Sequence, residues 1–184
     1  KQIKLALKNG VKIIQLRDKS NSDGFLESIA IKLQKIIKKH NAIFIINDRI
    51  NLAKKINADG VHIGLDDIDI KEARSLLKDK IIGVSCYGDL NKALLAEKYN
   101  ASYVAFGAVF PSKIKTKAKI IDKDLFKIAK QKLSIPICAI GGINSHNINT
   151  LYEDIDMLAV ISDIWQDNIA TQCIKLNSYF RKDK

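Results

Sequence analysis

Short apolar segments that alternate with helix-like segments along the chain constrain its fold more than any other feature. Continuous apolar runs such as FII at 44–46 and MLAVI at 157–161 are typical of strands covered on both faces, and hence of parallel sheets. Each run is followed by a segment with helical periodicity, which predicts an α/β protein. Seven strands are expected, over residues 11–16, 42–46, 61–65, 81–85, 103–110, 135–140 and 157–162.

Two α/β architectures fit this alternation. Seven strand–helix units, preceded by a helical segment at 1–9, predict a (β/α)8 TIM barrel that lacks its first strand in this chain, as one domain over residues 1–184. The chain begins at Lys1 rather than Met, so we expect that residues precede it. A doubly wound sheet is the alternative, but it would normally carry a glycine-rich loop after its first strand, and the sequence has none there.

The net charge of +11 could suit a nucleic-acid binder. However, the lysines are spread along helical segments such as KLQKIIKKH, and the aromatic residues, at 7%, do not interleave with them. A solvated lysine surface is therefore favoured, and no nucleic-acid partner is expected. No apolar run is long enough to span a membrane. The cysteines are odd in number and widely spaced, which indicates reduced thiols in a cytoplasmic protein: Cys86, Cys138 and Cys173.

Two acidic residues follow neighbouring strands of the predicted sheet. Asp48 follows the strand at 42–46, Asp67 follows the strand at 61–65, and a short helical crossover at 49–57 joins them. Parallel strands end at the same edge of a sheet, so the two carboxylates should lie side by side. Adjacent carboxylates repel one another, and a divalent cation is the usual reason for them to coexist. Alternatively, Asp48 caps the crossover helix, and Asp66 or Asp67 caps the helix at 70–78.

Polar residues follow almost every other predicted strand, where a barrel carries its active site. Gly141 and Gly142 are suited to binding a phosphate, since glycine lets backbone N–H groups approach closely and a following helix would add its dipole. His62 lies within a strand and is interpreted as a packed, hydrogen-bonded histidine rather than a base. The remaining strand-end residues are Gln15, Arg17, Lys19, Asn47, Ser85, Ser112, Lys113, Lys115 and Ser162.

Seven motifs resemble the thiamine-phosphate synthase family, which also holds the thiazole tautomerases. They occur in family order and cover nearly the whole chain: VKIIQLRDK, FIINDR, ADGVHIGLDD, IIGVS, YVAFGAVFPSKIK, IPICAIGGI and AVISDI. The resemblance implies a transferase that joins a pyrimidine diphosphate to a thiazole phosphate and releases pyrophosphate. Its expected partners are these small molecules, with homo-oligomers possible.

The resemblance also implies a role for each matching residue. Asp48 and Asp67 would bind Mg²⁺, the expected cofactor, and catalysis would fall to Lys115, Ser85 and Arg17. The pyrimidine diphosphate would be held by Gln15, Arg17, Lys19 and Asn47, with Ser85 and Lys115 contacting its pyrimidine and pyrophosphate. The thiazole phosphate would be held by Ser112, Lys113, Ile114, Gly142, Ile161 and Ser162.

The sequence departs from the family at two positions and leaves two alternatives open. Leu65 stands where the family usually has glutamine, and Ile114 stands where it usually has threonine. The alternatives are a thiazole tautomerase of the same fold and a degenerate paralogue that binds substrate without turnover. The carboxylate pair and Lys115 favour the synthase over the tautomerase, which needs no machinery for pyrophosphate.

Overall fold

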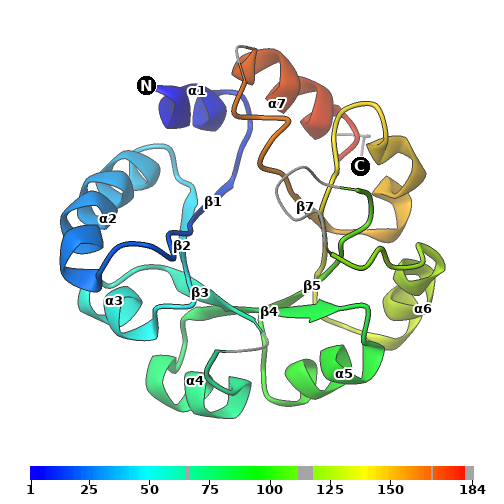
Figure 1. The fold of residues 1–184 in the computed structure, drawn as a ribbon, viewed down its shortest axis with the longest axis horizontal. Coiled ribbons are helices and arrows are strands. Elements are labelled where there is room, and N and C mark those ends of the chain that lie inside the picture. Colours follow the sequence, from blue (N-terminus) through cyan, green and yellow to red (C-terminus); the bar gives the residue numbers. More distant parts are fainter. Residues whose placement is uncertain (65–66, 112–117, 167, 181–184) are drawn as a thin grey trace.

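Seven parallel strands form one curled sheet with helices on its outside (Figure 1). The computed structural model describes residues 1–64, 67–111, 118–166 and 168–180. Neighbours in sequence are neighbours in the sheet, in the order β1 to β7. The strands are β1 (Ile13–Leu16), β2 (Ile43–Asn47), β3 (Gly60–Ile63), β4 (Ile81–Tyr87), β5 (Tyr103–Phe106), β6 (Ile137–Ile140) and β7 (Met157–Ala159).

The helices follow the predicted alternation. Glycine at position 10, with φ of 101°, ends the first helix as expected, because this backbone conformation is unfavourable for other residues. The helices are α1 (Gln2–Lys8), α2 (Asp23–Lys38), α3 (Ile50–Lys55), α4 (Ile70–Leu77), α5 (Leu90–Lys98), α6 (Asp124–Lys132) and α7 (Ile169–Ser178).

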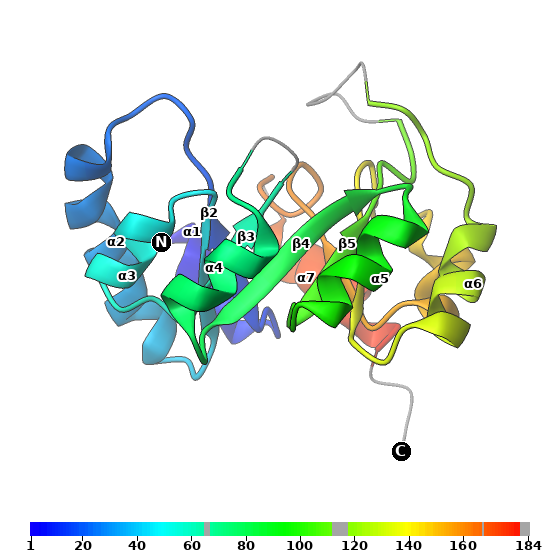
Figure 2. The same cartoon turned by 90° about the horizontal axis from the view of Figure 1, so that it is seen from below.

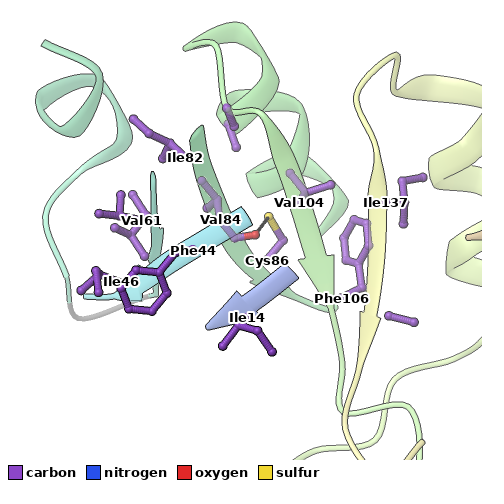
Figure 3. Close-up of a cluster of buried hydrophobic side chains, with 14 of the residues drawn as sticks. Ile14, Phe44, Ile46, Val61, Ile82, Val84, Cys86, Val104, Phe106 and Ile137 are labelled. Carbon is purple, nitrogen blue, oxygen red and sulfur yellow. Dashed lines mark hydrogen bonds between the residues drawn. The ribbon is translucent and has the colours of Figure 1, made fainter. Parts of the chain in front are cut away.

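The main hydrophobic core lies between the sheet and its ring of helices. Because successive strand residues face opposite sides, alternate residues of each strand point outward into this layer. Figure 3 shows part of it, with Phe44 and Ile46 from β2, Val84 from β4 and Phe106 from β5. Phe126 of α6 meets Phe106 edge-on, at 6.0 Å between ring centroids. Helices therefore cover the outer face, which leaves the inner face for other contacts.

A smaller cluster lines the inside of the curled sheet. It is formed by Tyr103, Ala105 and Cys138, all buried, which alternate with the outward-facing residues of β5 and β6. Gly83 of β4 makes room for it, since a β-carbon there would lie 2.0 Å from the Tyr103 ring. The inner face is thus narrow and packed at its base, as a small barrel requires.

The sheet curls as a barrel but its order runs only from β1 to β7 among the described residues. Helices α1 and α7 meet beside the first and last strands, where Ala6 packs against Ile169 and Cys173 (Figure 1). The loop that follows β1 rises from one side of the ring (Figure 2). This arrangement confirms the barrel prediction over the doubly wound alternative, and it agrees with a barrel that lacks its first strand.

The helix expected after Gly141 and Gly142 does not form. Residues 144–154 form two short 3₁₀ turns, Ile148–Thr150 and Tyr152–Asp154, instead of an α-helix. Asn147 explains the irregular start, because its side chain accepts a hydrogen bond from the N–H of Asn144 and donates one to the carbonyl of Gly142. Such local side-chain bonds compete with regular helical bonding.

Phe126→Ala should lower the free energy of unfolding by about 3–5 kcal/mol, because it leaves a cavity beneath α6. Phe25→Ala is the matched control, since that ring is 57% exposed and its loss should cost less than about 0.5 kcal/mol. Chemical denaturation of both variants measures the difference. Equal losses would contradict the assignment of the core to the layer between sheet and helices.

Candidate active site

Asp48 lies directly after β2 and points its carboxylate at Lys19. The two groups form an ion pair of 3.0 Å between Lys19 Nζ and Asp48 Oδ2. Asp48 has a φ of 63°, an unusual conformation for a residue other than glycine, and its N–H donates to the carbonyl of His62 on β3. Left-handed residues of this kind are frequent at functional sites. The sequence correctly places a carboxylate here, and the structure adds its partner.

Asp67 lies beside Asp48, as the sequence predicts. Burial raises the pKa of the Asp67 carboxyl, and a hydrogen bond with Asp48 and the negative charge of Asp48 raise it further. The N–H of Gly64 and the charge of Lys19 act in the opposite direction. Two carboxyl groups that share a site in this way disfavour simultaneous ionisation unless a cation is supplied.

The interpretation of these aspartates as helix caps is wrong. Helix α3 is preceded by Arg49, whose side chain makes no capping bond. Helix α4 is capped by Asp69, which accepts a hydrogen bond of 2.8 Å from the N–H of Lys71. Asp66 lies outside the described residues. Asp48 and Asp67 are thus not occupied in holding helix ends.

The carboxylate pair suits Mg²⁺ by the chemistry of its donors. This ion binds proteins through one or two carboxylates and completes its shell with water and substrate phosphates. Across the described ranges, no group of three or more histidine, cysteine or acidic side chains forms a complete protein-only site. Two oxygen-donor residues that would otherwise repel each other fit an ion shared with a phosphorylated substrate.

A chain of hydrogen bonds runs across the inner face from Ser85 to Tyr103. His62 joins them, with Nε2 2.8 Å from Ser85 Oγ and Nδ1 2.9 Å from Tyr103 Oη. Burial strongly raises the pKa of the Tyr103 phenol, so it remains protonated. The interpretation of His62 as a packed, hydrogen-bonded residue is confirmed, and its contact fixes the hydroxyl of Ser85.

The remaining predicted residues of the first two strands lie around this centre. Asn47 is the last residue of β2 and is 8% exposed, directly across the ladder from His62. Gln15 lies in β1 on the side opposite the buried Ile14. Arg17 follows β1 and is exposed. Two neutral amides and one cation therefore lie in or directly follow the first two strands.

The loop after β6 lies against the described start of the loop after β5. Gly142 has a φ of 68°, and a β-carbon there would lie 2.5 Å from the carbonyl oxygens of Phe110 and Pro111. Glycine is therefore needed for the β6 loop to approach the β5 loop. The expected contribution of a helix dipole at Gly142 is wrong, because no α-helix lies between β6 and β7. Ser112, Lys113, Ile114 and Lys115 lie outside the described residues.

Ile161 and Ser162 follow β7 and are both exposed, with Ile161 at 50%. The carboxylate of the next residue, Asp163, accepts a 3.2 Å hydrogen bond from the N–H of Ser145. This bond joins the β7 loop to the β6 loop near Gly142. The sequence interpretation missed Asp163, although it lies within the AVISDI motif.

Arg49 was also missed, although it ends the FIINDR motif. Its guanidinium contacts the loop that carries Arg17 and Lys19. The pattern of polar residues at strand ends could not show what Asp163 and Arg49 bind, because each contacts a segment that is distant in sequence. Their positions directly beside predicted site residues were the available signal.

A curled parallel sheet with helices on its outside and polar side chains at its strand ends is typical of barrel enzymes that act on small molecules. The chain matches the family model described as thiamine monophosphate synthase over residues 1–164, and it belongs to that family. It is a transferase of thiamine biosynthesis. No helix among the described residues is long and apolar enough to cross a bilayer.

Individual relatives agree with this assignment. Thiamine-phosphate synthase of Wolinella succinogenes is 47% identical over 165 residues, which cover 90% of this chain and 77% of the relative. That of Clostridium tetani is 37% identical over 185 residues, covering 99% of this chain and 88% of the relative. The solved thiamine phosphate pyrophosphorylase of Pyrococcus furiosus has a TM-score of 0.90 at 31% identity, covering 98% of this chain and 88% of the other.

Asp67→Asn should raise the free energy of unfolding at neutral pH relative to the unsubstituted protein. The folded-state pKa of Asp67 lies above its unfolded value, so the stability it contributes is complete below the unfolded pKa and is lost as pH rises through the folded one. Asparagine does not ionise and avoids this loss. Denaturation curves across acidic to neutral pH, in the absence of divalent ions, should show the stability difference growing with pH.

A stability difference for Asp67→Asn that stays constant with pH would contradict the assigned environment of this carboxyl.

Proposed function

We propose that this chain condenses 4-amino-2-methyl-5-(diphosphooxymethyl)pyrimidine with 4-methyl-5-(2-phosphooxyethyl)thiazole to give thiamine phosphate and pyrophosphate. Mg²⁺ is the cofactor, held by Asp48 and Asp67. Family membership supports the type of reaction. The observation that carries the residue assignment is the meeting of Lys19, Asp48 and Asp67 at the ends of adjoining elements.

The chemistry requires a leaving group to depart with its charge neutralised. The C–O bond between the pyrimidine methylene and the diphosphate breaks, and its electron pair leaves with pyrophosphate. The aminopyrimidine stabilises the resulting benzyl-like cation, and the lone pair of the thiazole nitrogen then forms the new C–N bond. Mg²⁺ supplies neutralisation of the diphosphate when bound. Lys19 and Arg17 add positive charge at the same edge.

Breaking the C–O bond and forming the C–N bond needs no protein nucleophile. The properties of the interior side chains are consistent with this mechanism. Burial raises the pKa of Cys86 to about 12 and that of Cys138 to about 12, so neither thiol ionises readily. Both ring nitrogens of His62 are hydrogen-bonded to neighbours. The interior therefore orients substrates through Asn47, Gln15 and Ser85 instead of attacking them.

The loops after β6 and β7 suit the phosphate of the thiazole. Gly142 exposes backbone at close approach to the β5 loop, and Ser162 is an exposed hydroxyl at the end of β7. The predicted contacts from Ser112, Lys113, Ile114 and Lys115 complete this side of the proposal. Ile161 supplies apolar surface beside them.

The cysteines support the predicted cytoplasmic location. Cys86, Cys138 and Cys173 are buried free thiols. Thiols of this kind persist where the environment is reducing.

Asp48→Ala should lower kcat/KM for thiamine phosphate formation by at least about 100-fold, because it removes a ligand that neutralises the departing charge. The assay supplies both substrates with Mg²⁺ and measures thiamine phosphate and pyrophosphate. Asp124→Ala is the charge-matched control on the exposed face of α6 and should leave the rate unchanged.

An inactive full-length protein, or full activity in Asp48→Ala, would refute the proposal. Turnover of the thiazole carboxylate phosphate without metal would instead indicate a tautomerase. Substrate binding without any turnover would indicate a degenerate paralogue.

Lys115→Ala should lower kcat by about 100-fold, as expected when one group that stabilises developing negative charge is lost. Lys119→Ala is the control, because Lys119 is an exposed lysine of the same basic segment. Steady-state rates at saturating Mg²⁺ measure both. An unchanged kcat in Lys115→Ala would remove this residue from the mechanism.

A further inference from the structure

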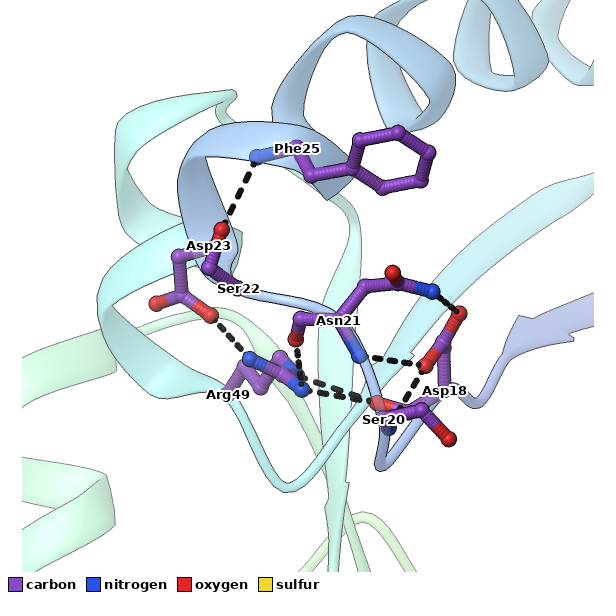
Figure 4. Close-up of polar contacts among 7 residues, drawn as sticks. All are labelled: Asp18, Ser20, Asn21, Ser22, Asp23, Phe25 and Arg49. Atoms are coloured by element: carbon purple, nitrogen blue, oxygen red, sulfur yellow. Dashed lines mark hydrogen bonds and ion pairs between the residues drawn. The ribbon is translucent and has the colours of Figure 1, made fainter.

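Arg49 connects two segments that are distant in sequence. It follows Asp48 directly, and its side chain is 23% exposed. The guanidinium donates to the carbonyl of Asp18 from Nε at 3.2 Å and from Nη2 at 2.8 Å, and to the carbonyl of Asn21 from Nη2 at 2.7 Å. Nη1 lies 2.5 Å from a carboxylate oxygen of Asp23 (Figure 4).

The segment held by Arg49 is the loop between β1 and α2. This loop is closed internally by Asp18, whose carboxylate accepts hydrogen bonds from the N–H of Ser20 and from the N–H and side-chain amide of Asn21 (Figure 4). Ser22 then caps α2 through the N–H of Phe25. The loop is therefore a preformed turn, and Arg49 fixes that turn to the end of β2.

The same two segments carry the groups that form the ion pair of the site. Lys19 follows Asp18, and Asp48 precedes Arg49, so the guanidinium joins the two backbones within one residue of each partner. Lys19 is 58% exposed on a flexible stem, and an ion pair this exposed is too weak to hold a loop. The network around Arg49 has four hydrogen bonds to three acceptor residues, so it is the stronger connection.

We propose that Arg49 is a positioning residue, which holds the β1–α2 loop so that Lys19 faces the diphosphate of the substrate. This inference rests on the proposed function and extends it to a residue outside the substrate contacts. Arginine is required because its planar fork presents several donors in fixed directions. A lysine at position 49 keeps the charge but cannot reach the two carbonyls and the carboxylate together.

Arg49→Gln and Arg49→Lys should both raise KM for the pyrimidine diphosphate by about 10-fold, since misplaced binding groups lose most of their contribution. KM for the thiazole phosphate should stay the same, because that substrate is assigned to the opposite loops. Restoration of KM by Arg49→Lys would overturn the proposal, since charge alone would then explain the effect.

Lys55→Gln is the matched control. Lys55 also links the α3 segment to α2, through a 2.6 Å ion pair with Glu27, but it does not touch the β1–α2 loop. Its loss should leave both KM values unchanged. A rise in KM equal to that of Arg49→Gln would mean that α2–α3 packing, and not the loop, is responsible.

A double-mutant cycle with Lys19→Ala separates positioning from general stability. If Arg49 acts through Lys19, then Arg49→Gln should raise KM by less than about 2-fold once Lys19 is absent, as coupled residues are non-additive. Equal effects in both backgrounds would overturn the inference.

Hydrogen exchange tests the role of Arg49 in holding the loop without any measurement of enzymatic activity. In Arg49→Gln the amides of Ser20 and Asn21 should exchange at least about 10-fold faster, while those of β2 and β3 keep their rates. If the unsubstituted protein makes no thiamine phosphate, the proposed function is refuted. The exchange rates still show whether Arg49 holds the β1–α2 loop. Unchanged exchange at Ser20 and Asn21 would overturn the role of Arg49.

Discussion

The parallel pairing of β2 with β3 is the constraint on which the site depends. In this register Asn47 lies opposite His62, and the N–H of Asp48 extends the ladder to the His62 carbonyl. Parallel strands end at one edge, so the pairing brings the carboxylate after β2 to the one after β3. The energy to hold these like charges comes from the apolar layer behind them, where Phe44, Ile46 and Val61 are buried.

The two faces of the curled sheet have different roles: the outer face packs against the helices, and the inner face carries hydrogen-bonded polar side chains. Outward residues such as Val84 and Phe106 stabilise the protein by packing against helices. Inward residues such as His62 and Ser85 are linked by hydrogen bonds, which are strong in a confined interior and specify one arrangement. Strand alternation assigns each residue to one role, so the core can be apolar without depriving the site of polar groups.

The positive charge of Lys19 offsets only part of the negative charge that Asp48 and Asp67 can carry. Lys19 pairs with Asp48, while burial and the neighbouring Asp48 raise the pKa of Asp67. The two adjacent carboxyl groups would be stabilised by a bound cation, and Lys19 would attract a phosphate. The positive charge spread over the helices adds a long-range attraction for anions, although it does not select among them.

Much of this could be predicted from the sequence. Apolar periodicity fixed the order of strands and helices, since it depends on neighbours along the chain. The position of Asp48 and Asp67 after consecutive parallel strands then required them to meet. The strand-end rule also predicted Asn47 and Ser85 as site residues. Asn47 ends β2, whereas Ser85 lies inside β4, which runs on to Tyr87.

Tertiary structure alone decided the partners of these residues. The chain does not specify which distant carbonyls Arg49 contacts, because that depends on how the β1–α2 loop folds over the end of β2. The sequence pattern also does not show that 3₁₀ turns form after Gly142 in place of an α-helix. These turns form because hydrogen bonds of the Asn147 side chain compete with helical bonding. The amino-acid sequence by itself determined which strand residues face the inside of the sheet, through their two-residue alternation. Their pairing was decided by long-range contacts that no local period encodes.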